Sequence, residues 1–305
     1  MIRLLNYLIT RKIATSKALF APLGDGVRGL PMLTGESISE AEAVELAEGC
    51  PAGAIRVLEK EDGRQVLEMD RGACTTCGFC LDVYPTAAIK SDPNTMIATR
   101  KRDQLISSVA LNDTSLDTAS GVAGDTACKT ASGVKTDTAG GVHEFFEAAD
   151  NLPQDAIESD LARENLISKI FGRSIAIRVV STGCSSCDLE IGAAGNPIFD
   201  MERFGMHVVA SPRFADVLLV TGPVPKAMHE PLRLCYEAMS EPRLVVAVGS
   251  CAISGGVLKD SYAQANGVGA VLPVDVFIPG CPPHPWSIID GIAMAMGRKR
   301  QGRLK

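Results

Sequence analysis

The sequence predicts an α/β protein of two unequal parts: a parallel-sheet domain over residues 151–305 and a small α+β domain over residues 1–100. Three observations predict this. The second half alternates short Val, Ile and Leu runs with helical patterns, as in a parallel sheet covered on both faces. The first half carries four cysteines among short apolar runs. A polar stretch, residues 101–150, separates the two parts of the 305-residue chain.

The elements expected in the second half follow one another at short intervals. A helix over residues 157–171 leads into it, because apolar side chains recur there at helical spacing. The strands are expected over residues 175–181, 207–211, 217–221, 244–248 and 274–278, and further helices over residues 226–239 and 286–296. Parallel strands end at the same edge of a sheet, so the loops after them should gather there.

The connector over residues 101–150 is rich in Ser, Thr, Ala, Gly and Asp and contains a short repeat. Its copies are Asp117–Val122, Lys129–Val134 and Asp137–Val142. A solenoid repeat needs roughly 20 residues or more to bury a face, and these units are shorter and polar. We therefore expect a disordered or loosely ordered linker, in which Cys128 is an incidental thiol.

Composition excludes several classes of protein. The net charge is −6, which argues against a nucleic-acid partner, since a phosphate backbone requires clustered Lys and Arg. A membrane-spanning helix needs about 20 mostly apolar residues, and the sequence contains no such run. We expect a protein that is soluble or peripheral on a membrane complex. Ten cysteines without an export signal indicate a reducing compartment, where spaced cysteines are more often metal ligands than disulfides.

The first group of cysteines is Cys74-Thr-Thr-Cys77-Gly-Phe-Cys80, a C-x2-C-x2-C run. Bacterial ferredoxins continue this run with x3-C-P, but here Tyr84 stands in the fourth place, followed by Pro85. The missing ligand is found upstream, because Cys50-Pro-Ala-Gly-Ala-Ile matches Tyr84-Pro-Thr-Ala-Ala-Ile, 34 residues later.

The upstream half therefore kept only its fourth cysteine. The positions that match the three downstream cysteines hold Glu40, Ala43 and Leu46. In two-cluster ferredoxins the fourth cysteine of each run ligates the cluster of the other run. The sequence thus predicts a ferredoxin-type domain with a second, empty site and one 4Fe-4S cluster bound by Cys50, Cys74, Cys77 and Cys80. The alternative is a zinc site, which usually takes two C-x2-4-C pairs rather than a triplet and a single cysteine.

A second group of cysteines follows the predicted parallel strands. Cys184 and Cys187 come after the first strand, Cys251 after residues 244–248 and Cys281 after residues 274–278. Because these strand ends share one edge of the sheet, the four thiolates can converge. Glycines at 183, 249 and 280 let the backbone approach closely. Cys235 lies in a predicted helix among apolar residues, and we interpret it as a core residue.

Residues from about 171 to 300 resemble the small subunit of membrane-bound (group 4) nickel–iron hydrogenases of the formate hydrogenlyase and hydrogenase-4 type. The same family contains the 20-kDa subunit of respiratory complex I. The stretches that carry the resemblance are Phe171–Arg178, Cys184–Ile191, Asn196–Gly205, Val209–Pro223, Val246–Cys251 and Ile278–Pro283.

The resemblance implies a flavodoxin-like fold and a second 4Fe-4S cluster on Cys184, Cys187, Cys251 and Cys281. It implies an oxidoreductase subunit that relays electrons to or from a large subunit. That partner would hold the nickel–iron centre, so no catalytic residue is expected on this chain. Further iron–sulfur and integral membrane subunits, and a place on the inner, cytoplasmic face of the membrane, are implied as well.

Two alternatives remain open. Complex I subunits usually carry two adjacent cysteines at the first ligand position, whereas this chain has Cys184-Ser-Ser-Cys187, which resembles the hydrogenase branch. A complex I-like quinone oxidoreductase subunit is therefore the second hypothesis, and a zinc-stabilised scaffold without redox function is the third. Glu190 is either a proton-relay carboxylate or a helix N-terminal charge. Arg213 either tunes the nearby cluster or pairs with Asp216.

Overall fold

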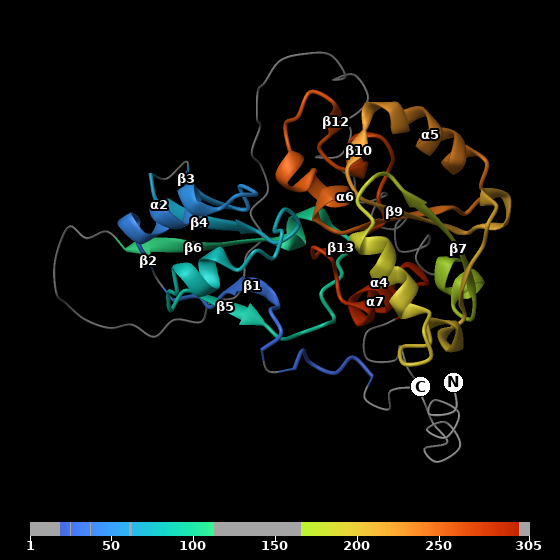
Figure 1. The fold of residues 1–305 in the computed structure, drawn as a ribbon, viewed down its shortest axis with the longest axis horizontal. Helices are drawn as coiled ribbons and strands as arrows, with labels where there is room; N and C mark the ends of the chain where they lie inside the picture. Colours follow the sequence, from blue (N-terminus) through green and yellow to red (C-terminus); the bar gives the residue numbers. More distant parts are fainter. Residues whose placement is uncertain (1–18, 25, 37, 61–62, 113–165, 299–305) are drawn as a thin grey trace, which may run out of the picture.

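The computed structural model describes residues 19–24, 26–36, 38–60, 63–112 and 166–298 (Figure 1). The helix expected over residues 157–171 is described from residue 166, and it is helical to residue 171. Residues 113–150 of the expected linker, with Cys128, lie outside the described residues. Within the described ranges, no helix has the length and apolar character needed to cross a membrane.

The second half is built on a parallel five-stranded sheet (Figure 1). Its strands are β7 (Ile175–Ser181), β8 (Met206–Val208), β9 (Val217–Thr221), β11 (Leu244–Val248) and β13 (Val276–Ile278). They lie in the order β13-β11-β9-β7-β8. Numbered along the chain, this is the 2-1-3-4-5 order of flavodoxin-like sheets. The predicted α/β class and parallel sheet are confirmed.

Both faces of this sheet are covered, and the central strand β9 shows how. Val217 and Leu219 pack in a core with α4 (Ser186–Ala194) and α7 (Pro285–Ala295). Leu218 and Val220 pack on the other face, in a core with α5 (His229–Glu237) and α6 (Ser250–Ser254). Every β9 residue is buried, which explains why the strand is a continuous apolar run rather than an alternating one.

Three of the five predicted strands have the observed bounds, and the other elements differ at their ends. Strand β8 stops at Val208, shortly before the 3-10 turn η4 (Pro212–Phe214). Strand β13 begins at Val276, because the Asp275 carboxylate accepts a hydrogen bond from the Val245 N–H at 2.8 Å. The helix expected over residues 226–239 is divided into η5 (Lys226–Met228) and α5.

The N-terminal half contains two sheets, ordered β2-β6-β4-β3 and β1-β5. Its elements are β1 (Leu30–Leu33), β2 (Ile38–Ser39), α2 (Glu40–Gly49), β3 (Ile55–Glu59), β4 (Gln65–Asp70), the π-helical turn η1 (Phe79–Val83), β5 (Ile89–Asp92), η2 (Arg102–Leu105) and β6 (Ile106–Asn112). The smaller elements of the second half are η3 (Met201–Phe204), β10 (Val224–Pro225), η6 (Gly256–Leu258), β12 (Gln264–Ala265) and η7 (Val268–Ala270).

Helix α2 occupies the place where the upstream cysteine run would have been. Ser39 and Glu42 form a capping box that begins the helix, and Cys50 follows its last turn. Ala43 and Leu46, which stand at lost ligand positions, are fully buried and pack with Leu67 and Met69. Apolar packing thus replaces the ligands in the upstream half. The assignment of this half to the ferredoxin type stays a prediction.

The prediction of a linker over residues 101–150 is wrong for residues 102–112. Residues 102–112 form η2 and β6, and β6 pairs antiparallel with β4 and parallel with β2. The boundary at residue 100 was drawn from composition, but Ile106–Asn112 gains its partners from strands more than 30 residues away. The N-terminal half therefore extends at least to Asn112, while the division into two domains stays a prediction.

The two halves are joined by the segment that leads into β6. Thr99 and Phe277 exchange two backbone hydrogen bonds of 2.8 and 3.0 Å, and Arg100 donates to the Met294 carbonyl at 2.8 Å. Ala98 belongs to the core beneath α7, and Leu105 to the core beneath α5 and α6. This segment thus packs into the parallel-sheet half although it continues into a strand of the other half.

Candidate metal centres

The first cysteine set lines one apolar pocket in the N-terminal half. Cys50 lies at the end of α2, Cys74 and Cys77 in the loop after β4, and Cys80 in η1. Backbone amides point at two of the sulfurs. The Ala54 N–H donates to Cys50 Sγ at 3.3 Å, and the Thr76 N–H donates to Cys74 Sγ at 3.4 Å. An iron–sulfur cluster is bound by four cysteine sulfurs as ligands, and its potential depends on hydrogen bonds to sulfur such as these.

Two of these thiols, Cys74 and Cys80, have raised pKa values. The pKa of Cys74 is raised to about 12, chiefly by burial; the Thr76 N–H lowers it, and the neighbouring Cys80, Cys50 and Cys77 contribute smaller increases. Burial also raises the pKa of Cys80 to about 11, with Cys50 and Cys77 as the next causes. Four thiolates are therefore unfavourable in this pocket without a positively charged group, which a metal cluster supplies.

The turn between Cys77 and Cys80 requires a glycine. Gly78 has φ of +84°, and a Cβ there would overlap the guanidinium of Arg28. Arg28 is held in that place because it donates to the Cys77 carbonyl at 2.9 Å and forms an ion pair with Asp82. Thr76 also has a positive φ, of 56°, and its buried hydroxyl has no hydrogen-bond partner within the described ranges. A bound group that accepts hydrogen bonds would give the Thr76 hydroxyl a partner in this pocket.

The second cysteine set gathers at the carboxyl edge of the parallel sheet. Cys184 and Cys187 lie at the start of α4, after β7, whereas Cys251 lies in α6, after β11, and Cys281 follows β13. The pKa of Cys187 is raised to about 12, chiefly by burial and then by Cys281, Cys184 and Cys251 in that order. The pKa of Cys251 is raised by burial, and then by Cys281 and Cys184. All four predicted residues therefore share one place.

Two glycines keep the backbone next to these sulfurs. Gly249 has φ of +89°, and a Cβ there would lie 2.6 Å from Cys187 Sγ. Gly256 has φ of +57°, and a Cβ there would lie 2.8 Å from Cys251 Sγ. A Cβ atom is essentially never found this close to another heavy atom, so any other residue at either position would force the neighbouring sulfur to shift. The loops are shaped around sulfur atoms, which fits a thiolate-bound group at the sheet edge.

The described residues contain no group of three His, Cys, Asp or Glu side chains arranged to hold a single metal ion. A 4Fe-4S cluster makes a different demand, because each thiolate binds its own iron atom and the sulfurs need not converge on one ion.

The other residues considered from the sequence have distinct surroundings. Arg213 is exposed and forms no ion pair within the described ranges, because Asp216 instead accepts the Ala176 N–H at 2.8 Å. Glu190 lies past the first turn of α4, and burial raises its pKa. The first-turn acid is Asp188, which accepts a hydrogen bond of 2.6 Å from the Thr221 hydroxyl. His284 begins α7 by accepting the Trp286 N–H.

Sequence reasoning missed the residues that support the cysteines rather than bind metal. Asp70 is buried, and its carboxylate accepts hydrogen bonds from the N–H groups of Gly72 and Ala73, just before Cys74. Arg28 and Thr76 were missed as well. Gly78, in the Cys77-Gly-Phe-Cys80 run, was the one sequence signal for these supporting residues, because its position requires a positive φ.

Comparison with known proteins identifies relatives of the parallel-sheet half. Residues 184–295 match the family described as the 20-kDa subunit of NADH–ubiquinone oxidoreductase. Formate hydrogenlyase subunit 7 of Escherichia coli is 42% identical over 139 residues, which are 46% of this chain and 54% of that protein. The chain thus spans about half the length of that relative.

Two further relatives cover both branches of the predicted resemblance. The probable membrane-bound hydrogenase subunit mbhJ of Pyrococcus furiosus is 41% identical over 48% of this chain and 87% of its own length. An NADH-quinone oxidoreductase subunit of Desulfovibrio desulfuricans is 47% identical over 40% of this chain and 66% of its own length. The family match at residues 184–295 includes all four cysteines of the second set.

Proposed function

Because this chain is an oxidoreductase subunit that belongs to the family of the complex I 20-kDa subunit and the nickel–iron hydrogenase small subunit, we propose that it relays electrons in a membrane-associated nickel–iron hydrogenase complex. The observation that carries the proposal is the gathering of eight cysteines into two sets, one in each half. Each set would hold one 4Fe-4S cluster.

The proposed ligands are Cys50, Cys74, Cys77 and Cys80 for the first cluster and Cys184, Cys187, Cys251 and Cys281 for the second. The clusters would supply one-electron transfer. The fold buries Cys80 and Cys187, directs N–H groups at Cys50 and Cys74, and leaves no side chain at positions 249 and 256. Burial, hydrogen bonds to sulfur and exposure to water are the features that set a cluster's potential.

The proposed partners are a large subunit with a nickel–iron centre, further iron–sulfur subunits and integral membrane subunits. In this proposal the chain is peripheral on the inner, cytoplasmic face of the membrane. The names of two relatives, a formate hydrogenlyase subunit and a probable membrane-bound hydrogenase subunit, support it. Dihydrogen chemistry would take place on the large subunit, and this chain would contribute no catalytic residue.

Purification of the whole assembly and an assay of dihydrogen evolution test the proposal. We expect evolution with a low-potential donor, and we expect it to stop when Cys184 is replaced by Ser. A matched control is Cys235→Ser, because Cys235 lies in α5 and packs beside the core on the other face of the sheet, outside both sets. An assembly with intact clusters and a nickel-free large subunit would contradict the hydrogenase proposal.

A complex I-like role is the second candidate, because a quinone oxidoreductase subunit is 47% identical to this chain over the matched region. It predicts quinone reduction by the purified assembly without exchange of dihydrogen. The same assembly distinguishes the two candidates, since the large subunit of a hydrogenase must bind nickel. A non-redox zinc scaffold is tested by metal analysis, because it would contain zinc and no iron.

A further inference from the structure

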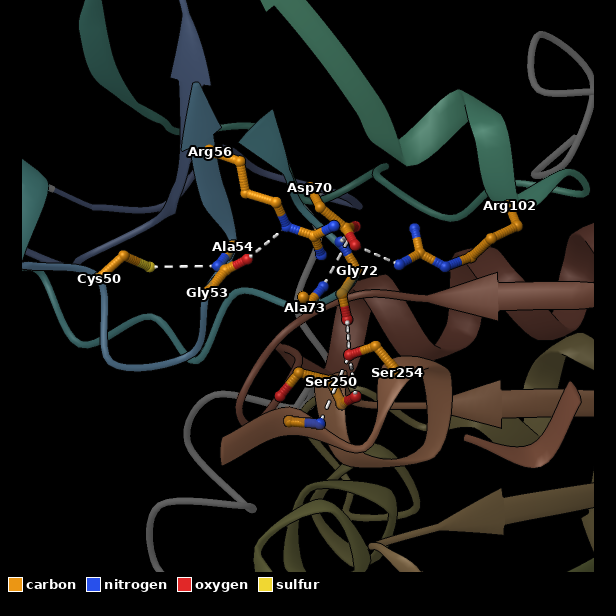
Figure 2. Close-up of polar contacts among 11 residues, drawn as sticks. Cys50, Gly53, Ala54, Arg56, Asp70, Gly72, Ala73, Arg102, Ser250 and Ser254 are labelled. Atoms are coloured by element: carbon orange, nitrogen blue, oxygen red, sulfur yellow. Dashed lines mark hydrogen bonds and ion pairs between the residues drawn. The ribbon is translucent and has the colours of Figure 1, made fainter. Parts of the chain in front are cut away.

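The loop that carries Cys74 is fixed by a buried carboxylate (Figure 2). Asp70 Oδ1 accepts the N–H groups of Gly72 and Ala73 at 2.9 and 3.3 Å. Its Oδ2 forms an ion pair with Arg102, at the start of the segment that leads into β6. Asp70 is only 5% exposed, so these contacts compensate a charge that would be costly to bury alone. With the loop held by these contacts of Asp70, the Gly72 carbonyl points out of the loop.

That carbonyl meets the helix that carries Cys251. In Figure 2 the side chain of Ser254 in α6 points up at Gly72, and its Oγ lies 3.3 Å from the Gly72 oxygen. The same hydroxyl lies 3.0 Å from the Ser250 carbonyl, one helical turn back, so both carbonyl oxygens are within hydrogen-bond distance of it. Ser254 is 182 residues from Gly72 in the sequence, and it is buried.

The contact is close enough to exclude any side chain at Gly72. A Cβ there would lie 2.8 Å from an Arg102 nitrogen and 2.9 Å from Ile253 Cγ2. Gly72 is thus needed because α6 and Arg102 approach its backbone from outside the loop, and its own φ requires no glycine. The Cys74 loop and helix α6, which carries Cys251, are therefore in direct contact at this point.

We propose that Ser254 is a positioning residue that holds the Cys74 loop against α6, so that the two cysteine sets keep one fixed relative placement. Between Cys74 and Cys251 the bonded route passes along Ala73 and Gly72, crosses the single hydrogen bond to Ser254 and returns along α6. This inference rests on the proposed function, because the purpose of a fixed placement is a constant separation between the two clusters. It concerns a residue that binds neither metal nor substrate.

The experiment uses the full chain with reconstituted clusters and the variant Ser254→Ala. The matched control is Ser91→Ala, which removes a serine hydroxyl that accepts the Gly29 N–H at 2.9 Å inside the N-terminal half. Amide hydrogen exchange is measured over residues 70–76. We expect exchange at Gly72 and Ala73 to rise about fivefold in Ser254→Ala, as for loss of one ordinary hydrogen bond, and to stay unchanged in Ser91→Ala.

A second readout is the EPR spectrum of the fully reduced protein, in which two neighbouring paramagnetic clusters broaden or split each other's signals. We expect a weaker interaction in Ser254→Ala at unchanged iron content. Unchanged exchange and unchanged spectra would overturn the proposal, as would equal changes in Ser91→Ala or loss of iron from Ser254→Ala. A parent protein that binds no iron would contradict the proposed function, whereas the exchange result would still decide the role of Ser254.

Discussion

Gly249 shows how closely single residues are matched to the sulfurs of the second set. Its φ of +89° and the 2.6 Å between an added Cβ and Cys187 Sγ exclude any other residue without movement of the loop. Gly192, in the same helix as Cys187, differs on both counts, because an added Cβ meets nothing within 4 Å and its φ is ordinary. Gly249 and Gly192 therefore serve as a test position and its matched control.

We therefore expect Gly249→Ala to lose about half of the bound iron, from the second set alone, because the new methyl displaces the Cys187 sulfur. Gly192→Ala should keep all of its iron, since Ala is favoured over Gly within a helix. Iron and sulfide analysis of the two variants after reconstitution checks this. Full iron content in Gly249→Ala would show that cluster binding at Cys187 does not need the close approach of the Gly249 backbone.

At this scale the sequence identified the eight cysteines through their spacing and through the strands that precede them. It could not identify Ser254, because its only signal is a contact across 182 residues. Asp70 was missed for a related reason, since one acid at the end of a strand is common and its burial depends on Arg102 and the following turn. Support residues become visible only when the fold brings distant segments together.

At the scale of elements, the segment from β4 to Cys74 depends on the buried pair of Asp70 and Arg102. The side chains of the pair are 8% and 31% exposed, so removal of one partner leaves a poorly solvated charge. By contrast, Arg233 pairs with Glu230 and Glu237 on the open face of α5, where more than half of the Arg233 and Glu230 side chains is exposed. Surface pairs of this kind contribute little to stability.

We expect Arg102→Ala to lower the free energy of unfolding by about 3 kcal/mol, because it leaves the Asp70 carboxylate buried without its partner. Arg233→Ala should leave the unfolding midpoint in urea unchanged. Equilibrium urea titrations of the two variants check the difference. Equal midpoints for Arg102→Ala and the parent protein would mean that water solvates Asp70 in place of the guanidinium.

Prediction of elements from the sequence succeeded where burial is uniform. Strands β9 and β11 were expected at their observed residues, because every residue in them is buried and they stand out as apolar runs. Strand β7 was also expected at its observed residues, although only Ile175 and Ile177 in it are buried. Strand β6 was assigned to a linker, because Ile106–Asn112 mixes Ser and Asn with apolar residues and lies at the edge of a Ser- and Asp-rich stretch. Its pairing with β4 and β2 outweighs that local composition.

At the scale of the whole molecule, the two halves share packing rather than only a covalent connection. Ala98 and Leu105 contribute to the two cores of the parallel-sheet half, and Thr99 pairs with Phe277. The expectation of domains over residues 1–100 and 151–305, joined by a linker over residues 101–150, did not include such sharing. A sequence pattern predicts each sheet by itself, but it does not predict which segments cross between them.

We expect the full chain to unfold in one cooperative transition, because loss of either half exposes apolar surface of the other. Tryptophan fluorescence reports Trp286 in α7, and the visible absorbance of bound clusters would report the cysteine sites. The two signals should change at the same urea concentration. Two separated midpoints would show that the halves fold independently and that the Thr99–Phe277 contact contributes little.

We propose that one chain holds two 4Fe-4S clusters, one in each half. Iron counting and EPR spectra of the reconstituted full chain, beside Cys77→Ser and Cys281→Ser variants, test this. We expect about eight irons and two cluster signals in the parent, and loss of a different signal with about four irons in each variant. A parent with only four irons or one signal, or the same signal lost in both variants, would contradict it.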